Sequence, residues 1–367
     1  MKRKNLFLLM LCMVFGLVFT SCDENNDGDN GGGGNVIENI DPSDRVFILN
    51  EGNYNSNNSG IDMYSPCGGA DGTSLFVKNV YMNQNGEGLG DTGQDLISHD
   101  GNLYASITGS SLLVKMDNAA KKLATISFDA SEGQPRYLAA KNGKIYVTLY
   151  GGYVAKIDAG SFQKEAMVQV GSNPEGIVEC NGKLYVCNSG WGYDNTMSVI
   201  DIATFTVEKT VEVATNPNEI IAAGGKIFIQ SYGGAYPDYD YQVQMYDPAS
   251  GSLERLTAAT KLAAYGDVVY IVYSDTDWTT YTTTNVFSTY NIKTRELKTE
   301  NYLKDMPAQL SSNGIYMIDI DPSNGDFYVS VSDYVSDGTV YRFESDGDLI
   351  DAMLSGGMNP TKTVFTN

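Results

Sequence analysis

The sequence predicts an all-β protein, a seven-bladed β-propeller whose ring is closed by a C-terminal strand that completes the first blade. Three observations lead to this prediction. A short strand signature recurs seven times, a turn that begins with Asp or Asn follows most copies, and the chain ends on a strand that its beginning lacks. The apolar runs are short, rich in β-branched and aromatic residues, and bounded by turn residues, as is typical of β-strands.

The strand signature is a turn residue, one polar residue and an apolar, an aromatic and a second apolar residue, as in GKLYV at 182–186. Its copies lie at residues 44–48, 101–105, 143–147, 182–186, 225–229, 266–271 and 325–329. Successive copies begin 57, 42, 39, 43, 41 and 59 residues apart. This spacing is the period of a four-stranded propeller blade. The sixth copy contains one extra residue and is the least regular.

One complete blade extends from residue 173 to residue 213, with strands in NPEGIVEC, LYVCNS, MSVIDI and TFTVEKTVEV. We name its strands a to d in chain order. Asn181 and Gly182 suit a two-residue hairpin between strands a and b, because both central positions of a type I′ turn need positive φ. Asp or Asn opens the turn between strands c and d by bonding its own downstream backbone. These turns begin at Asp117, Asp158, Asp201, Asp247 and Asn291.

Both ends of the chain favour closure into a ring. The first signature has no strand a before it, whereas GMNPTKTVF at 357–365 matches the opening of a middle blade. We therefore expect blade one to combine three N-terminal strands with a strand a from the C-terminus, which removes most of the open sheet edge. Residues 45–367 form one domain on this interpretation, because each blade buries its faces only against its neighbours.

Residues 1–21 are predicted to be a lipoprotein signal peptide. Three basic residues precede an apolar run at 6–19, which is short for a membrane span. The tetrapeptide FTSC at 19–22 resembles a bacterial lipoprotein box, in which Cys22 becomes the lipidated N-terminus. Such an anchor holds a protein at a membrane without crossing it. The alternative is an ordinary secretory signal followed by a chance cysteine.

Residues 22–44 are predicted to be an acidic tether rich in Gly and Asn. The stretch DENNDGDNGGGGN at 23–35 offers no apolar side chain to bury, so we expect it to be flexible. Its acidic cluster also resembles the export signal that sends lipoproteins of Bacteroidota-type bacteria to the outer face of the outer membrane. The alternative is a spacer that serves only solubility.

Charge and reactive residues exclude several functions. The chain has 24 basic and 45 acidic side chains, and loss of residues 1–21 removes three basic ones, which leaves a net charge of −24. Such a surface repels phosphate backbones and anionic lipid, so no nucleic acid partner is expected. The single histidine, His99, lies at an a–b turn, which argues against a zinc site and against histidine-assisted nucleophilic catalysis. We expect neither an enzyme nor a cofactor, although chemistry based on carboxylates alone stays open.

Metal and disulfide sites are also not expected. Acidic turns at 319–326 and 274–277 offer oxygen ligands for calcium, but neither has the spacing of a full calcium loop, and the first is a common hairpin sequence. Cys180 and Cys187 lie on paired strands, but their offset along the strand, roughly 13 Å, is beyond disulfide reach.

The candidate binding site is the rim that carries the long b–c loops. Those loops and the d–a connections vary in length, whereas the a–b and c–d turns are short, and alternating strand direction places both variable sets on one face. The rim aromatic residues are Tyr54, Tyr150, Trp191, Tyr193, Tyr232, Tyr236, Tyr239, Trp278, Tyr281 and Tyr334. Tyr and Trp suit a ligand that is part apolar and part hydrogen-bonding; alternatively, they pack the loops against one another. Three polar residues near the central axis are candidate anchors: Arg136, Glu175 and Glu219.

The sequence VFILNEGNYNSNNSGIDMY at 46–64 and the recurring pattern GKLYV…SVIDIAT…VEV…NP resemble the YncE-like surface-layer propeller family of bacterial lipoproteins. The resemblance covers roughly residues 45–367. It implies an outer-membrane lipoprotein that faces the cell exterior. Within that family, Bacteroidota lipoproteins of the BtuG kind capture corrinoids and pass them to a TonB-dependent transporter.

The leading expectation is therefore a surface lipoprotein that binds a small-molecule nutrient, with a corrinoid such as cobalamin as the candidate, and that touches the membrane only through its lipid anchor. The corrinoid expectation rests on fold, anchoring and rim chemistry together, because fold alone does not determine function. The alternative is a glycan- or protein-binding accessory propeller of a surface uptake complex. A propeller lyase or lactonase with a divalent ion is a third possibility.

Overall fold

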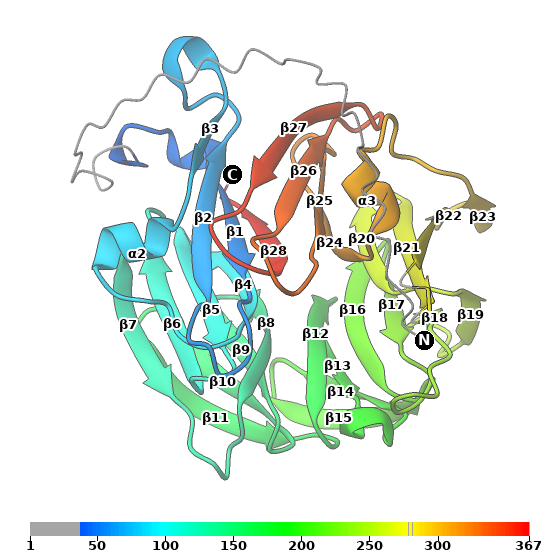
Figure 1. The fold of residues 1–367 in the computed structure, drawn as a ribbon. Helices are drawn as coiled ribbons and strands as arrows, with labels where there is room; N and C mark the ends of the chain where they lie inside the picture. Colours follow the sequence, from blue (N-terminus) through cyan, green and yellow to red (C-terminus); the bar gives the residue numbers. More distant parts are fainter. Residues whose placement is uncertain (1–36, 278, 281, 367) are drawn as a thin grey trace, which may run out of the picture. The chain divides into compact units, whose positions relative to one another are not determined.

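Four-stranded antiparallel sheets follow one another seven times around a ring, which confirms the predicted β-propeller (Figure 1). The computed structural model describes residues 37–277, 279–280 and 282–366, all within one structural unit. The predicted signal peptide and Cys22 lie outside the described residues, as do Trp278 and Tyr281. Within the described part of the chain, no helix has both the length and the apolar character needed to cross a membrane.

Each blade runs from an innermost strand a to an outermost strand d. Blade one contains β28 (Pro360–Phe365), β1 (Val46–Asn50), β2 (Gly60–Ser65) and β3 (Leu75–Val77). Blade two contains β4 (Gly93–His99), β5 (Asn102–Ile107), β6 (Leu112–Asp117) and β7 (Lys122–Ser127). Blade three contains β8 (Pro135–Lys141), β9 (Lys144–Leu149), β10 (Tyr153–Asp158) and β11 (Gln163–Gln169). Blade four contains β12 (Pro174–Cys180), β13 (Lys183–Asn188), β14 (Thr196–Asp201) and β15 (Thr206–Glu212).

Blade five contains β16 (Pro217–Ala223), β17 (Lys226–Ser231), β18 (Gln242–Tyr246) and β19 (Leu253–Thr257). Blade six contains β20 (Lys261–Tyr265), β21 (Val268–Asp277), β22 (Thr282–Asn291) and β23 (Glu296–Thr299). Blade seven contains β24 (Ile315–Ile320), β25 (Phe327–Val331), β26 (Thr339–Phe343) and β27 (Leu349–Leu354). Two short helices, α2 (Val80–Asn85) and α3 (Ala308–Ser312), lie in long connections between blades.

The predicted turns form as expected. Asn181 and Gly182 have φ of 53° and 77°, and Cys180 pairs with Lys183 across them, which makes a two-residue a–b hairpin with positive φ at both centres. In the c–d turn of blade four, the Asp201 carboxylate accepts a hydrogen bond from the backbone amide of Thr204 at 2.8 Å. Local turn chemistry therefore sets the ends of the strands.

The ring closes as predicted, because β28 pairs with β1 and completes blade one. The segment before β1 is fastened at the same place. Arg45 is buried and donates to the carbonyls of Ile37 and Ile40 at 2.8 and 2.6 Å, and Thr366 donates to the carbonyl of Pro42. Residues 37–44, part of the expected tether, thus pack against the propeller. The chain enters the ring at the face of the short turns.

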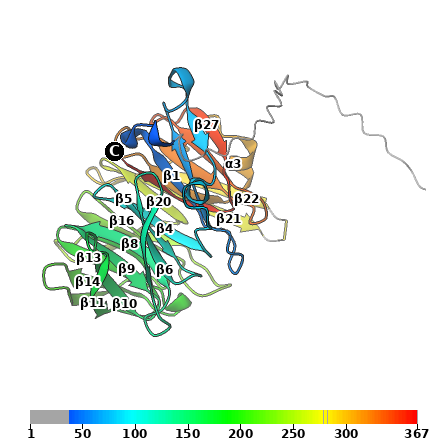
Figure 2. The same cartoon turned by 90° about the vertical axis from the view of Figure 1, so that its left-hand side faces the viewer.

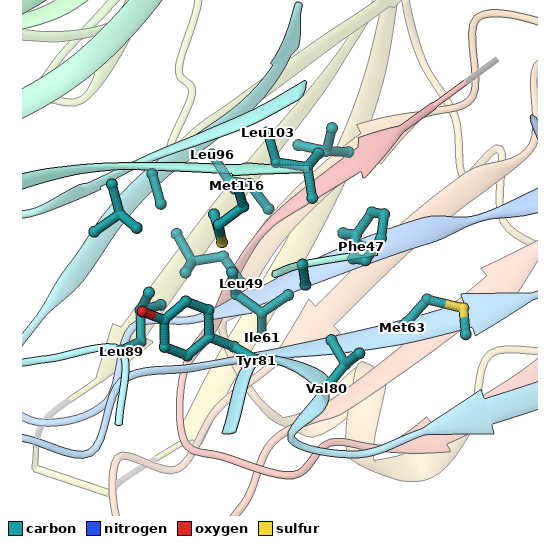
Figure 3. Close-up of a cluster of buried hydrophobic side chains, with 14 of the residues drawn as sticks. Phe47, Leu49, Ile61, Met63, Val80, Tyr81, Leu89, Leu96, Leu103 and Met116 are labelled. Atoms are coloured by element: carbon teal, nitrogen blue, oxygen red, sulfur yellow. The ribbon is translucent and has the colours of Figure 1, made fainter. Parts of the chain in front are cut away.

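The aromatic residue of the repeated signature joins each blade to the next. Tyr104 of blade two contacts Phe162 of blade three, with ring centres 6.1 Å apart. Tyr146 of blade three contacts Phe205 of blade four at 5.9 Å in the same way. Between blades one and two, a cluster of buried aliphatic and aromatic side chains that includes Phe47 fills the interface (Figure 3). Burial of each such side chain contributes about 1.5–3 kcal/mol. The repeated aromatic residue therefore stabilises the interface between neighbouring blades.

Cys67, Cys180 and Cys187 are unpaired, and for Cys180 and Cys187 this agrees with their predicted offset along paired strands. Cys180 and Cys187 are buried in one apolar cluster between blades four and five, whereas Cys67 is exposed. Two of these three thiols are therefore removed from solvent.

Candidate ligand-binding site

The variable loops share one rim of the propeller. Ser189, at the start of the b–c loop of blade four, donates its backbone amide to the carbonyl of Asn173, in the connection that precedes β12, at 3.2 Å. The amide of Tyr232 makes the equivalent bond to Asn216 in blade five at 2.9 Å. Figure 2 shows the long β21–β22 hairpin and the β1–β2 loop projecting from one side, with the C-terminus on the other. The predicted division into a plain face and an elaborated face is confirmed.

Most of the described rim aromatic residues expose their side chains to solvent. More than half of the surface is exposed in Tyr54, Trp191, Tyr193, Tyr236 and Tyr334. Tyr239 is less exposed, and Tyr150 and Tyr232 lie lower, partly buried among their neighbours. The set therefore contains exposed aromatic residues and partly buried ones. Packing between loops explains the partly buried residues better than the exposed ones.

Two exposed aromatic residues have strained backbone conformations. Trp191 has φ of 54° and Tyr334 has φ of 61°, in the left-handed region that bulky residues avoid. In each loop a serine two residues earlier accepts the backbone amide of the aromatic residue: Ser189 at 3.3 Å and Ser332 at 3.0 Å. Such strain costs about 1–3 kcal/mol and clusters at functional sites. The fold thus holds these two rings outward at an energetic cost.

Trp191 packs against a network of ring contacts and hydrogen bonds that contains two of the three predicted polar anchors, Arg136 and Glu175. Its ring contacts Tyr150 edge-on, with centres 5.9 Å apart, and the Tyr150 hydroxyl donates to Glu175 at 2.6 Å. Arg136 lies 4.7 Å from the centre of the Tyr150 ring, donates to the other oxygen of Glu175 at 2.9 Å and also donates to Gln94.

Both charged groups of this network are largely buried. Burial alone lowers the pKa of Arg136, but the charge of Glu175 and the nearby tyrosines raise it above its usual value. The Arg136 guanidinium is therefore fixed in its charged form, and its ion pair with Glu175 supports Tyr150 and Trp191. Both partners are engaged with each other before any ligand arrives.

Glu219, the third predicted anchor, lies deeper, in the wall of the axial channel. That channel holds a cavity of about 420 Å³ lined by the innermost strands of all seven blades. Three carboxylates in its wall each accept a backbone amide from the next blade: Asp95 from Leu138 at 2.9 Å, Glu219 from Leu262 at 3.1 Å and Asp319 from Thr363 at 2.7 Å. Glu219 therefore joins blades five and six, in addition to any contact it makes with a ligand.

Burial raises the pKa of the channel carboxylates. For Asp95 the pKa rises to about 6, because desolvation outweighs the charge of Lys362. Desolvation also raises the pKa of Glu219, against the charge of Lys261. Lys362 itself pairs with Asp319 at 2.5 Å. The channel is thus lined by charged groups, and the two lysines offset only part of the negative charge of the carboxylates.

A cluster of tyrosines covers the rim of blade five. Tyr232, Tyr239 and Tyr241 pack mutually, with ring centres 5.2–5.6 Å apart, and Tyr236 adds an exposed ring 6.2 Å from Tyr239. Gly192, beside Trp191, lies so close to the backbone of Ala235 that an added Cβ would come within 2.7 Å of it. The aromatic-rich loops of blades four and five are therefore in contact with each other.

Three residues at the mouth of the channel were not predicted from the sequence: Glu51, Lys261 and Tyr316. The hydroxyl of Tyr316 donates to Glu51, and Lys261 lies 5.8 Å above the Tyr316 ring. Their positions within the repeated blade give a weak indication that they lie at the channel mouth. Glu51 immediately follows strand b, as Tyr150 and Tyr232 do, and Lys261 opens strand a.

The remaining polar candidates have structural partners. His99 ends β4 and lies 3.3 Å from Asp100, at the face opposite the rim, as the sequence places it. In the acidic turn after β24, Asp321 accepts the amide of Ser323 at 2.8 Å, and Asp326 forms an ion pair with Arg342 at 2.7 Å. These carboxylates therefore serve the turn and a neighbouring strand.

Comparison with known proteins assigns a family. Residues 44–233, just over half of the 367-residue chain, match the family model described as a domain of unknown function, DUF5074. The chain belongs to the DUF5074 family. No curated protein matches the sequence of this DUF5074 propeller.

Solved propellers resemble it in fold. Hydrazine synthase of Kuenenia stuttgartiensis is 15% identical, with a TM-score of 0.61 over 72% of this chain and 87% of that chain. BamB from Moraxella catarrhalis is 16% identical, with a TM-score of 0.51 over 84% and 83%. The Pan2 WD40 domain of Neurospora crassa is 11% identical, with a TM-score of 0.52 over 69% and 75%. At these identities the likeness of the DUF5074 propeller concerns the fold alone.

Proposed function

We propose that this DUF5074 propeller is a ligand-binding lipoprotein of the bacterial outer membrane. It captures a small-molecule nutrient at its elaborated rim, with a corrinoid such as cobalamin as the candidate, and delivers it to a TonB-dependent transporter. The observation that carries the proposal is the pair of strained, solvent-exposed aromatic residues, Trp191 and Tyr334, that the fold holds outward at the mouth of a polar channel. Strain at an exposed aromatic ring is poorly explained by stability alone.

The chemistry of the rim supports a ligand with both apolar and hydrogen-bonding parts. Exposed rings offer rigid contact area at low entropic cost, and the polar groups below them fix orientation. The resemblance to YncE-like lipoproteins of Bacteroidota adds the surface location, the anchor at Cys22 and the corrinoid candidate. With one histidine, placed away from the rim, the proposal is a binding protein rather than an enzyme.

A glycan-binding accessory role is the second candidate. The rim of blades four and five favours it, because Tyr193 and Tyr236 are both largely exposed and the loops that carry them meet where Gly192 approaches Ala235. Extended aromatic surfaces suit the apolar faces of sugar rings, with the hydroxyls left to polar neighbours. The two candidates use the same rim and differ in the ligand that it selects.

Isothermal titration of the purified protein with cyanocobalamin tests the corrinoid version, and maltoheptaose is the matched carbohydrate probe. The chain has two tryptophans, of which Trp191 lies in a b–c loop and Trp278 is predicted from the sequence to lie in another, so intrinsic fluorescence is the probe chosen for the rim. Heat and quenching at micromolar cyanocobalamin support capture of a corrinoid. Absence of both signals with cyanocobalamin, together with binding of maltoheptaose, transfers the proposal to the glycan version, and absence with both probes refutes it.

A further inference from the structure

The channel mouth contains two clusters built from the same four chemical parts. In the first, Trp191 contacts Tyr150, whose hydroxyl donates to Glu175 and whose ring lies under Arg136. In the second, Tyr334 contacts Tyr316 with ring centres 5.7 Å apart. The Tyr316 hydroxyl donates to Glu51, and its ring lies under Lys261.

The two clusters lie at different sectors of one mouth. The first belongs to blades three and four, and the second to blades six, seven and one. They are close enough to interact electrostatically, since burial raises the pKa of Glu51 while the charges of both Arg136 and Lys261 oppose the rise. A ligand that covers the mouth therefore meets an exposed ring on each side, at Trp191 and at Tyr334.

The clusters differ in how far their charged groups are satisfied. Arg136 is hydrogen-bonded to Glu175 and Gln94, and little of its side chain is exposed. Lys261 donates no hydrogen bond to any described residue, and its nearest carboxylate, Glu219, is 3.8 Å away. Glu51 accepts the Tyr316 hydroxyl but has no described cation within 4 Å. The charged groups of the first cluster are thus hydrogen-bonded to each other. In the second cluster, Lys261 can still donate a hydrogen bond and Glu51 can still accept one.

We propose that the second cluster is the subsite that recognises the polar groups of the ligand, and that Lys261 and Glu51 bind an uncharged group with both an acceptor and a donor, such as a carboxamide or a hydroxyl. This inference rests on the proposed function and names the chemistry that its site selects. A half-buried ammonium without a hydrogen-bond partner gains most from a ligand oxygen.

The charges around Lys261 select against an anion. Glu219 lies 3.8 Å from Lys261, and Glu51 also interacts with Lys261 electrostatically, so a group bound at Lys261 lies near two carboxylates. A ligand carboxylate or phosphate would be repelled by both. A carbonyl or hydroxyl oxygen accepts from the ammonium without this repulsion, and an adjacent N–H or O–H of the same ligand donates to Glu51.

The test combines variants of the second cluster with a matched control. Lys261→Met removes the donor, and Glu51→Gln keeps the size and the Tyr316 contact while it removes the charge. Lys209→Met is the control, because Lys209 also lies over a tyrosine, 5.4 Å from the centre of the Tyr246 ring, but on the outer strands of the blades. Isothermal titration uses cyanocobalamin, which carries carboxamides, and maltoheptaose, which carries hydroxyls.

For the probe that the unmodified protein binds, we expect Lys261→Met to weaken the affinity about 10-fold or more and Glu51→Gln about 5-fold, as befits hydrogen bonds to charged groups. Lys209→Met should leave it within about twofold, and the affinity should change little with ionic strength. If Lys261→Met does not fold, Glu51→Gln alone decides.

Unchanged affinity in the folded cluster variants, alongside a clear loss in Trp191→Ala, refutes the subsite and leaves the proposed function standing. A steep loss of affinity with salt refutes the uncharged ligand. No binding of either probe by the unmodified protein refutes the proposed function and the subsite together.

Discussion

Replacing Trp191 by Gly and, separately, by Ala tests whether the rim stores backbone strain for binding. Both changes remove the same exposed ring and the same contact with Tyr150. They differ in the backbone, because Trp191 has φ of 54°. A left-handed conformation costs an alanine about 1–2 kcal/mol and a glycine almost nothing, while glycine loses about 0.5–1 kcal/mol more chain entropy on folding.

The glycine variant should therefore unfold with a free energy about 0.5–1 kcal/mol higher than the alanine variant, the reverse of the usual order. Urea unfolding of both variants measures this difference. Binding should fall equally in both, by about 2 kcal/mol, because one buried aromatic ring contributes about that much to a site. Titration with the probe that the unmodified protein binds measures the loss.

Tyr265→Ala is the matched control, because Tyr265 is a partly exposed tyrosine that ends β20 at the face of the short turns. It should leave the affinity unchanged. An alanine variant at Trp191 that is more stable than the glycine variant would contradict the strain argument. Full affinity in both Trp191 variants would show that the ring only packs its loop.

Four further changes have defined outcomes. Burial raises the pKa of Asp95 to about 6, so the folded state binds more protons than the unfolded chain and loses stability as pH rises from about 4 to about 6. Asp95→Asn should remove about 3 kcal/mol of that loss. Urea unfolding at the two ends of this pH range measures the difference. Arg136→Met leaves Glu175 buried without its cationic partner and should cost about 3–5 kcal/mol in denaturant unfolding, with part of the loss recovered by adding Glu175→Gln. Deleting β28 (Pro360–Phe365) opens the ring, so thermal unfolding should lose its single cooperative transition. Cys22→Ser should move the protein from the membrane fraction to the soluble fraction if the proposed anchor is correct, and retention in the membrane fraction would contradict it.

Trp278 and Tyr281 remain predictions of the sequence for the blade-six part of the rim. Trp278→Ala should weaken binding by about 2 kcal/mol with little change in thermal unfolding, on the same reasoning as for Trp191. Fluorescence quenching by the ligand in Trp191→Phe, in which Trp278 is the remaining tryptophan, measures its participation. Unquenched emission in a variant that still binds ligand would place the site away from this loop.

The sequence by itself determined the fold, because the features that specify a blade are local. Strand period, the Asn181-Gly182 turn and the Asp201 turn all act within a few residues, and their spacing repeats with the blade. Ring closure could also be predicted from the sequence, because the strand that blade one lacks at the N-terminus lies at the C-terminus. The same local logic gave the elaborated rim and its exposed aromatic residues.

The pairing of residues at the mouth was decided only by the tertiary structure. Tyr316 and Glu51 are 265 positions apart in the chain, and they meet because the first and last blades become neighbours when the ring closes. The Trp191 ring likewise contacts Tyr150 of another blade, and no local pattern specifies that contact. Strand period and turn chemistry carry no information about which inner-strand side chains converge on the axis, because that convergence depends on the packing of all seven blades at once.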